Sequence, residues 1–234
     1  MSRKSEQFKG ITADVFWGAA AYAHRIQGGE YKKVDRPAFR GTDLDGVEYE
    51  EPALVSNRTH AKHALDNTAL ISAEDYAYGR KVRSYFKGLS FKALMGKLND
   101  FESNVLKFVD VENFEEDKNA AYHFAIVCSL PASYERSIKR ENVDARIRDA
   151  NSKHFGNVKE RLNLDIEIIR RVFSDKWGTF FLTAQVIGGE HKGNIVFFSY
   201  RNGIDPGTCL RIAGTVKGHR DEGQTQLNRV KVEK

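Results

Sequence analysis

Cysteine is scarce in this sequence of 234 residues, which holds only Cys128 and Cys209. The two do not form a Cys-x-x-Cys pair, and no cysteine–histidine spacing suits a structural zinc ion. Free cysteines of this kind usually behave as small apolar side chains buried in a core. We therefore expect neither a structural metal nor a disulfide. A disulfide is also disfavoured by the reducing environment of the cytoplasm.

Long apolar runs are absent as well. No stretch approaches the ~18 apolar residues of a membrane span, and the opening residues MSRKSEQFKG lack the apolar core of a secretion signal. Hydrophobic residues still make up 41% of the chain, enough for one large domain or two small ones to bury a core. These features predict a soluble protein that stays in the cytoplasm and has no membrane partner.

Signatures of catalysis are missing too. The sequence has no Walker phosphate loop, no G-x-S-x-G elbow and no dinucleotide fingerprint. His60 and His63 are the only close pair of histidines, and no acid or cysteine at a suitable spacing completes a metal site with them. We therefore predict a protein that is not an enzyme and that holds no cofactor and no metal. One alternative stays open: the acidic stretch around Asp43 and Asp45 could hold a divalent ion for a nuclease, although it lacks the spacing of an EF-hand and is more typical of a solvated loop.

Positive charge is concentrated in the last third of the chain. The net charge is +5, and residues 1–150 carry equal numbers of basic and acidic side chains, so the whole excess lies in residues 151–234. A cationic surface of this kind favours a polyanion as partner.

The N-terminal part of the sequence predicts helices. An alanine-rich helix is expected to begin at Thr12, as its cap, and to end at Gly28 and Gly29. Residues 34–57 have no clear periodicity and predict a loop or an irregular hairpin. Ser72, followed closely by acidic residues, is expected to cap the next helix.

Two further helices are predicted before the charge excess begins. Apolar residues recur at helical spacing from Phe91 to Val109, which predicts the most strongly amphipathic helix of the chain. An apolar segment then reaches Leu130 and is stopped by Pro131. The helix expected over residues 133–150 carries balanced charges, which we attribute to a solvated face.

Beyond residue 151 the pattern changes to that of strands. The run RLNLDIEI alternates apolar and polar residues, and further strand candidates follow at about 177–187, 194–200, 208–217 and 224–232, each after a turn that contains glycine. Five short strands at this spacing leave no room for crossover helices. The predicted fold class is therefore α+β, with a helical domain over residues 1–150 followed by a five-stranded antiparallel OB-like β-barrel over residues 151–234.

The barrel sequence combines aromatic and basic side chains. In the run KWGTFFLTAQV one strand face carries Trp177 and Phe181, while the other suits the core. Bases of a single-stranded nucleic acid stack on such rings, and cations follow its phosphates. The alternative is that rings such as Phe181, Phe197 or Phe198 only fill the core. The predicted nucleic-acid-binding residues are Lys176, Trp177, Phe181, Tyr200, Arg201, Arg211, Lys217, His219, Arg220, Arg229 and Lys231.

Several distinctive runs of the sequence resemble a family of proteins encoded by tailed bacteriophages. They are GTVKGHRDEGQTQLNRVKV near the C-terminus, FWGAAAYAHRIQGGEY, YGRKVRSYFKGLSFKALMGKLNDFE, SLPASYER and KWGTFF, and together they extend over most of the chain. The resemblance implies a phage origin and a C-terminal OB-fold-like module that handles single-stranded DNA. The chain departs from many single-strand binders in ending VKVEK rather than in an acidic tail. If the chain coats DNA, it either recruits replication proteins through another surface, for which the helical part is the candidate, or recruits none.

Taken together, these patterns predict a phage-encoded protein that binds single-stranded DNA, or alternatively RNA, during DNA replication or recombination in the host cytoplasm, with oligomers possible. The second hypothesis is an adaptor or regulatory protein without enzyme activity that binds a phage or host protein.

Overall fold

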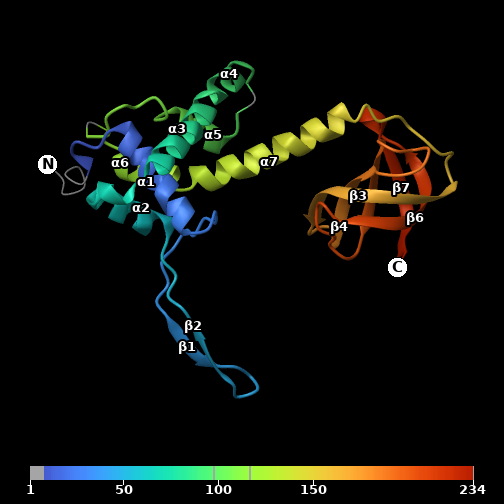
Figure 1. Cartoon of the computed structure of the whole chain (residues 1–234), viewed down its shortest axis with the longest axis horizontal. Helices are drawn as coiled ribbons and strands as arrows, with labels where there is room; N and C mark the ends of the chain where they lie inside the picture. Colours follow the sequence, from blue (N-terminus) through green and yellow to red (C-terminus); the bar gives the residue numbers. More distant parts are fainter. Residues whose placement is uncertain (1–7, 97, 116, 234) are drawn as a thin grey trace. The chain divides into compact units, whose positions relative to one another are not determined.

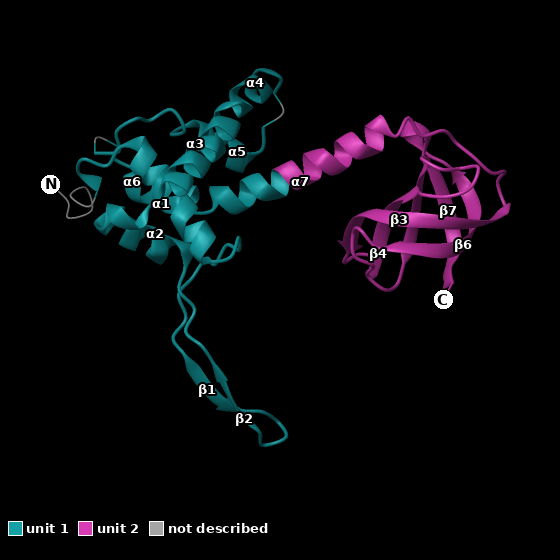
Figure 2. Ribbon diagram, viewed as in Figure 1, with its two compact units in different colours: residues 1–137 teal, residues 138–234 magenta. Residues whose placement is uncertain are grey.

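The computed structural model describes residues 8–96, 98–115 and 117–233. The chain divides into two compact units, residues 1–137 and 138–234 (Figure 2). The first unit contains helices and one β-hairpin, and the second contains a closed five-stranded β-barrel together with the end of helix α7 (Figure 1). The predicted α+β class, with helices followed by a barrel, is confirmed. No helix in the described part of the chain is both long and apolar enough to span a membrane.

Helix α1, Ala13–Ile26, forms the centre of the first unit. It packs against α2, Asn57–Asp66, and α3, Ala73–Lys87. The backbones of α1 and α3 approach closely at Gly79. A Cβ atom at this position would lie only 2.8 Å from the carbonyl oxygen of Trp17. Glycine at this crossing is therefore what lets the two helices pack in direct contact.

The two predicted helix caps differ in the structure. Ser72 forms a capping box with Asp75, because its Oγ accepts from the Asp75 N–H at 3.2 Å and the Asp75 carboxylate accepts from the Ser72 N–H at 2.9 Å. Arg25 donates two further hydrogen bonds to that carboxylate, at 2.9 and 2.8 Å. Thr12 does occupy the N-cap position of α1, but its side chain makes no capping hydrogen bond.

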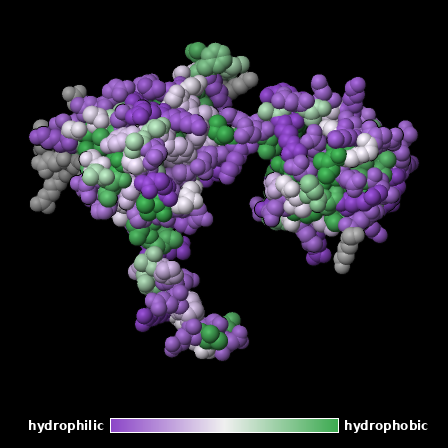
Figure 3. Space-filling view, viewed as in Figure 1, coloured by the Kyte–Doolittle hydropathy of each residue, from purple (hydrophilic) through white to green (hydrophobic). Residues whose placement is uncertain are grey.

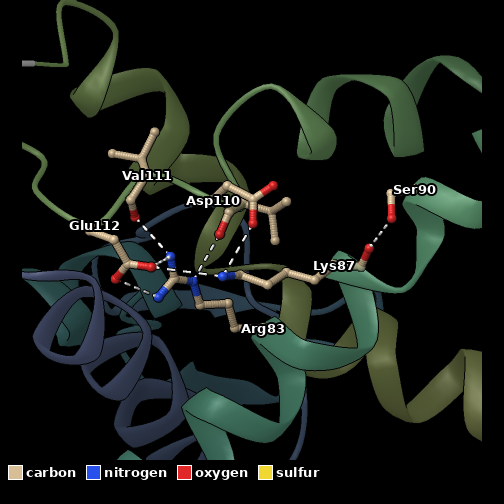
Figure 4. Close-up of polar contacts among 7 residues, drawn as sticks. Arg83, Lys87, Ser90, Asp110, Val111 and Glu112 are labelled. Atoms are coloured by element: carbon tan, nitrogen blue, oxygen red, sulfur yellow. Dashed lines mark hydrogen bonds and ion pairs between the residues drawn. The ribbon is translucent and has the colours of Figure 1, made fainter.

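Arg83 on α3 holds the segment 109–112 against the helices (Figure 4). Its guanidinium donates to the carbonyl oxygens of Val109 at 2.8 Å and of Val111 at 3.0 Å, and to the carboxylate of Glu112 at 2.9 Å. Arg83 is buried. Burial removes the guanidinium from water, and its hydrogen bonds to these three oxygen partners replace those that water would have made.

The prediction of one long amphipathic helix over residues 91–109 is wrong. Two short helices occupy this stretch, α4 at Leu89–Leu94 and α5 at Asp100–Leu106. Gly96 has φ +64°, the left-handed backbone that commonly ends a helix. Asn99 then caps α5, which begins as a separate helix.

Several apolar side chains of this stretch lie on the surface rather than in the core. Phe91, Leu94, Met95 and Phe101 are exposed, Leu94 at 85%. Figure 3 shows the apolar surface over α4. The helical spacing of these residues was therefore a misleading signal, since the break at Gly96 separates them from the core.

The segment predicted as a loop or irregular hairpin is a two-stranded antiparallel hairpin, β1 at Phe39–Thr42 and β2 at Glu48–Glu51, which projects from the helices (Figure 1). The carboxylate of Asp43 closes its turn by accepting from the N–H groups of Asp45 at 3.0 Å and Val47 at 2.8 Å. Among the residues placed by the structure, no group of three or more His, Cys, Asp or Glu side chains is arranged to hold a metal ion.

Helix α6, Ala120–Val127, leads into helix α7, Leu130–Asp149. Pro131 is the second residue of α7, where its missing N–H leaves no hydrogen bond unmade. The proline therefore marks the start of the charged helix, as its place in the sequence predicted. Two short 3-10 turns, η2 at Thr68–Leu70 and η3 at Asp221–Gly223, complete the helical elements described.

The barrel contains five strands in the order β3-β4-β5-β7-β6. Their bounds are Arg161–Ser174 for β3, Thr179–Val186 for β4, Ile195–Tyr200 for β5, Cys209–His219 for β6 and Thr225–Glu233 for β7. Neighbours are antiparallel except β5 and β7, which are parallel. This corrects the prediction of a wholly antiparallel barrel. Five is an odd number, so strand directions cannot alternate all the way around a closed ring.

The predicted alternation along the strands is confirmed inside the barrel. Leu162, Leu164, Ile166 and Ile168 of β3 belong to the buried core, together with the apolar face of β4. Strand β3 continues to Ser174, beyond its predicted end, and a bulge between Ile168 and Arg170 shifts its register against β4.

The residue in that bulge, Ile169, leaves the inner core. It packs against Ile147 of α7 and Ile195 of β5, which form a second buried apolar cluster. The last turns of α7 are thereby held on the outer face of the barrel.

Candidate functional site

A groove runs over the outer face of strands β3, β4 and β5. The last turns of α7 and the chain just after it border the groove, as does the loop between β6 and β7. All of its lining residues belong to the barrel unit. The groove has a volume of about 1240 Å³, more than the roughly 300–1,000 Å³ of a small-molecule pocket. An extended ligand fits this space better than a compact one.

Two aromatic rings form the floor of the groove. Phe181 on β4 and Phe197 on β5 lie with their ring centroids 5.6 Å apart and their planes within 12° of parallel. Strand alternation places them here, since Leu182 and Phe198, the next residue on each strand, are fully buried in the barrel core. Val172 lies opposite Phe181 on β3 and is half exposed. Both rings keep part of their surface accessible.

Four basic side chains line the same groove. Arg220, in the loop after β6, places its guanidinium 4.1 Å from the centroid of the Phe197 ring. Arg170 on β3 forms an ion pair with Asp144 of α7. Lys153 and Arg148 are exposed at the border formed by α7 and the chain that follows it. The groove therefore combines flat apolar rings with several cations.

Arg146 fixes the end of α7 on the barrel. Its guanidinium donates to the carboxylate of Glu167 at 2.6 Å and to the side-chain oxygen of Gln185 at 2.8 Å. The hydrogen bond from Arg146 lowers the pKa of the Glu167 carboxyl, against the smaller effect of burial. The sequence reading assigned Arg146 to a solvated helix face, whereas it positions the wall of the groove.

The loop that carries Arg220 is tied to the chain after α7. The hydroxyl of Ser152 donates to the carbonyl oxygen of Gly223 at 2.8 Å and accepts from the N–H of Ile195 at 2.8 Å. A Cβ atom built on Gly223, which has φ +70°, would lie 1.7 Å from the Ser152 carbonyl oxygen. Only glycine allows this close approach, so the glycine of this turn holds the loop at the groove.

The structure brings only part of the predicted site together. Of the predicted residues, Phe181 and Arg220 line the groove. Lys176 and Trp177 lie in the turn between β3 and β4, where the Trp177 ring is 66% exposed with the Lys176 ammonium 5.2 Å from its centroid. Arg201 is exposed in the loop after β5.

Tyr200 packs against the barrel core rather than in the groove. Its register explains the difference, because Tyr200 has the same phase as Phe198, whereas Phe197 and Ser199 have the opposite one. The strand alternation that predicted Phe181 on the outer face therefore argues against Tyr200 there.

The other predicted residues lie on β6 and β7, outside the groove lining. Arg211 is paired with Glu233 at 3.3 Å and approaches Asp165 at 3.9 Å. The ring of His219 stacks on that of His154, with centroids 4.7 Å apart. The remaining three, all exposed, are Lys217, Arg229 and Lys231.

Sequence reasoning did not select Phe197, Val172, Arg170, Arg148 or Lys153 for the site. The alternation of Phe197 with Phe198 was a usable signal for the outer ring. Val172 and Arg170 could not be placed from the pattern, because the bulge at Ile169 reverses the phase of β3. Arg148 at the end of α7 and Lys153 just after it depend on how that helix docks on the barrel.

The groove thus offers parallel rings, cations on several sides and a rigidly tied loop. Comparison of the chain with known protein families, with curated proteins and with solved structures finds no match. The ligand of the groove is therefore inferred from its own residues.

Proposed function

We propose that this protein binds single-stranded DNA in the groove of its C-terminal barrel, without catalysis, in DNA replication or recombination. The observation that carries the proposal is the parallel pair Phe181 and Phe197 beside the guanidinium of Arg220. Base stacking on an aromatic ring contributes ~1–3 kcal/mol per base, and cations neutralise the phosphates.

The place of the groove on the barrel supports the same ligand. An OB-fold binds oligonucleotides on the face of its second and third strands and with its first and fourth loops. Counted from β3, the groove lies on the second and third strands, β4 and β5, and beside the fourth loop, which carries Arg220. Trp177 lies in the first loop. We therefore regard the barrel as OB-like in use as well as in strand number.

A fluorescence titration with poly-dT at two salt concentrations tests this proposal. The affinity is expected to fall steeply as salt rises, because neutralised phosphates release counterions. A parallel titration with poly-U distinguishes DNA from RNA as the preferred strand. The absence of binding to either polymer at about 50 mM salt, the low end of the usual range, would count against the proposal, as would a flat salt response.

The phage origin suggested by the sequence motifs stays a prediction, and binding in the groove does not depend on it. Replication proteins are expected to bind through the helical unit.

A second candidate function is an adaptor that binds a phage or host protein. The exposed apolar side chains Phe91, Leu94, Met95 and Phe101 favour it, since exposed apolar patches often mark protein-binding surfaces. Partner binding that survives nuclease treatment and the loss of Trp177, but not Leu94→Asp, would support this function. Retention of the partner by Leu94→Asp would exclude this surface.

A further inference from the structure

We propose that the barrel has a second contact surface for the same nucleic acid strand, on the wall opposite the groove, which binds phosphates only. This surface, here called the cationic wall, consists of Lys159, Arg161, Lys217, Arg229 and Lys231. The inference rests on the proposed function, because it concerns how a strand longer than the groove is held.

The five cations lie in a row on β3, β6, β7 and the residue pair before β3. The N–H of Lys159 donates to the carbonyl oxygen of Val216 at 2.8 Å, so Lys159 lies beside the next residue, Lys217. Arg161 donates to the carbonyl oxygen of Arg229 at 3.3 Å, which joins β3 to β7. Lys231 follows two residues later on β7, opposite Ala213 of β6.

The charge of this row is available to a ligand. Within the described residues, the side chains of Lys159, Lys217, Arg229 and Lys231 form no hydrogen bond or ion pair, and all four are exposed. The hydrogen-bond partners of Arg161 are the hydroxyl of Thr215 and backbone carbonyl oxygens, so its charge is not neutralised.

The acidic side chains nearby offset only part of this charge. Asp165 and Glu233 face Arg211, at 3.9 and 3.3 Å, and so remove Arg211 from the available charge. Glu160 lies between Lys159 and Arg161 in the sequence, and its carboxylate accepts from the N–H of Asn157 at 2.6 Å, a neutral donor, so Glu160 offsets one of the five cations. The wall therefore keeps an excess of positive charge.

Arg229 is placed by a feature of the backbone that is unusual for its residue type. It lies where the register between β6 and β7 shifts, and its φ of +48° is in the left-handed region. A bulge turns a side chain to a new direction, and left-handed backbone is unfavourable at a residue other than glycine. The fold therefore accepts a local cost to present this arginine on the wall.

The composition of the wall indicates phosphate contact rather than base contact. The uncharged residues between its cations, Asn163, Ala213, Thr215 and Asn228, are small and carry no ring on which a base could stack. Contacts to phosphates position a strand without reading its sequence. A short strand would use the groove alone, whereas a long strand would also reach the wall.

Two strand lengths and two triple variants test this inference. The strands are oligo-dT of about 8 and about 30 nucleotides, chosen because one OB-fold binds roughly 4–16 nucleotides. The wall variant is Lys217→Ala/Arg229→Ala/Lys231→Ala. The control, Lys139→Ala/Arg140→Ala/Lys192→Ala, removes the same charge at exposed positions outside the wall and the groove lining.

The wall variant is expected to bind the long oligonucleotide more weakly than the wild type does. Its affinity for the short oligonucleotide should be unchanged. For the long oligonucleotide, the slope of log affinity against log salt should become shallower by about 2. Each neutralised phosphate contributes about 0.7 to this slope, and the variant removes three cations. The control variant should bind both strands as the wild type does.

Three results would overturn the inference. They are an unchanged slope of the wall variant for the long strand, an equal loss of affinity for both strands, and an equal loss in the control variant. The groove variant Phe181→Ala/Phe197→Ala keeps this failure separate from failure of the proposed function. If the groove variant binds both oligonucleotides more weakly while the wall variant binds them as the wild type does, the proposed function stands and the inference about the wall does not.

Discussion

The guanidinium of Arg220 lies 4.1 Å from the centre of the Phe197 ring. Arg220 comes from the loop between β6 and β7, and Phe197 from β5, so two separate elements of the barrel build this contact. In the proposed function, a cation at this position would contribute to stacking and would also meet the phosphate of a base stacked on the neighbouring Phe181 ring. The contact therefore joins both parts of the proposed binding chemistry in one place.

Substitution of Arg220 separates these two parts. Arg220→Ala is expected to weaken binding of oligo-dT and to reduce the salt slope by about 0.7, the value for one neutralised phosphate of a single strand. Arg220→Lys keeps the charge and loses the planar contact, so it should keep the slope while the affinity falls. The same reduced slope in both variants would contradict the cation–ring role.

Gly223 tests whether the loop must be tied to Ser152. The Cβ atom of Gly223→Ala would lie 1.7 Å from the Ser152 carbonyl oxygen, so the loop has to move away. We expect the free energy of unfolding to fall by about 1–3 kcal/mol, which lowers the melting temperature. DNA binding should weaken as well. Gly207→Ala is the matched control, because Gly207 also has positive φ, +89°, but has open space around it. Equal losses in both variants would mean that backbone strain alone matters.

The pH dependence of the helical unit should depend on Asp75. This carboxyl is 3% exposed. Burial raises its pKa, but the hydrogen bonds from Arg25 and Ser72 outweigh burial and hold the pKa below the ordinary value of 3.8. A pKa lower in the folded than in the unfolded state stabilises the fold above about pH 4, and this contribution is lost as pH falls through the folded pKa.

Asp75→Asn removes that contribution at neutral pH. We expect it to lower the free energy of unfolding by about 1–3 kcal/mol at pH 7, and the difference from wild type should shrink below about pH 4. Denaturant titrations at several pH values measure it. Asp14→Asn, in an exposed pair with Arg80, is the control and should cost less than about 1 kcal/mol. A difference that is independent of pH would contradict this role of Asp75.

Arg83 supplies a test of the network in Figure 4. Arg83→Lys keeps the charge but not the fork that reaches Val109, Val111 and Glu112. A buried guanidinium network of this kind should lose about 2–4 kcal/mol on that change. Arg80→Lys, in the exposed pair with Asp14, should have almost no effect. Chemical denaturation distinguishes them, and similar stabilities would show that the fork is not needed.

Regular alternation made the barrel predictable from the sequence. Each of the five predicted strands is present, because glycine-containing turns separate short runs with a period of two. The same alternation placed Phe181 outside and Leu182 inside. It failed where a backbone irregularity intervenes: the bulge at Ile169 reverses the phase of β3 and turns Arg170 and Val172 towards the groove.

Long-range docking limited the rest of the sequence reading. The apolar residues from Phe91 to Phe101 have helical spacing, but a left-handed glycine at Gly96 ends the helix and leaves them exposed. Arg146 and Arg148 look like any solvated helix residues until α7 is placed on the barrel. The basic residues of β6 and β7 were correctly expected on the surface, yet a closed barrel puts them opposite the rings.

The most direct test of the account is the affinity of Phe181→Ala/Phe197→Ala for poly-dT, measured by fluorescence titration at low salt. Loss of two stacking rings predicts affinity at least about tenfold weaker, from ~1–3 kcal/mol for each stacked base, with the fold intact by circular dichroism. Tyr122→Ala, an exposed ring on α6, is the control and should bind as the wild type does. A folded double variant that binds poly-dT as tightly as the wild type would contradict the central claim.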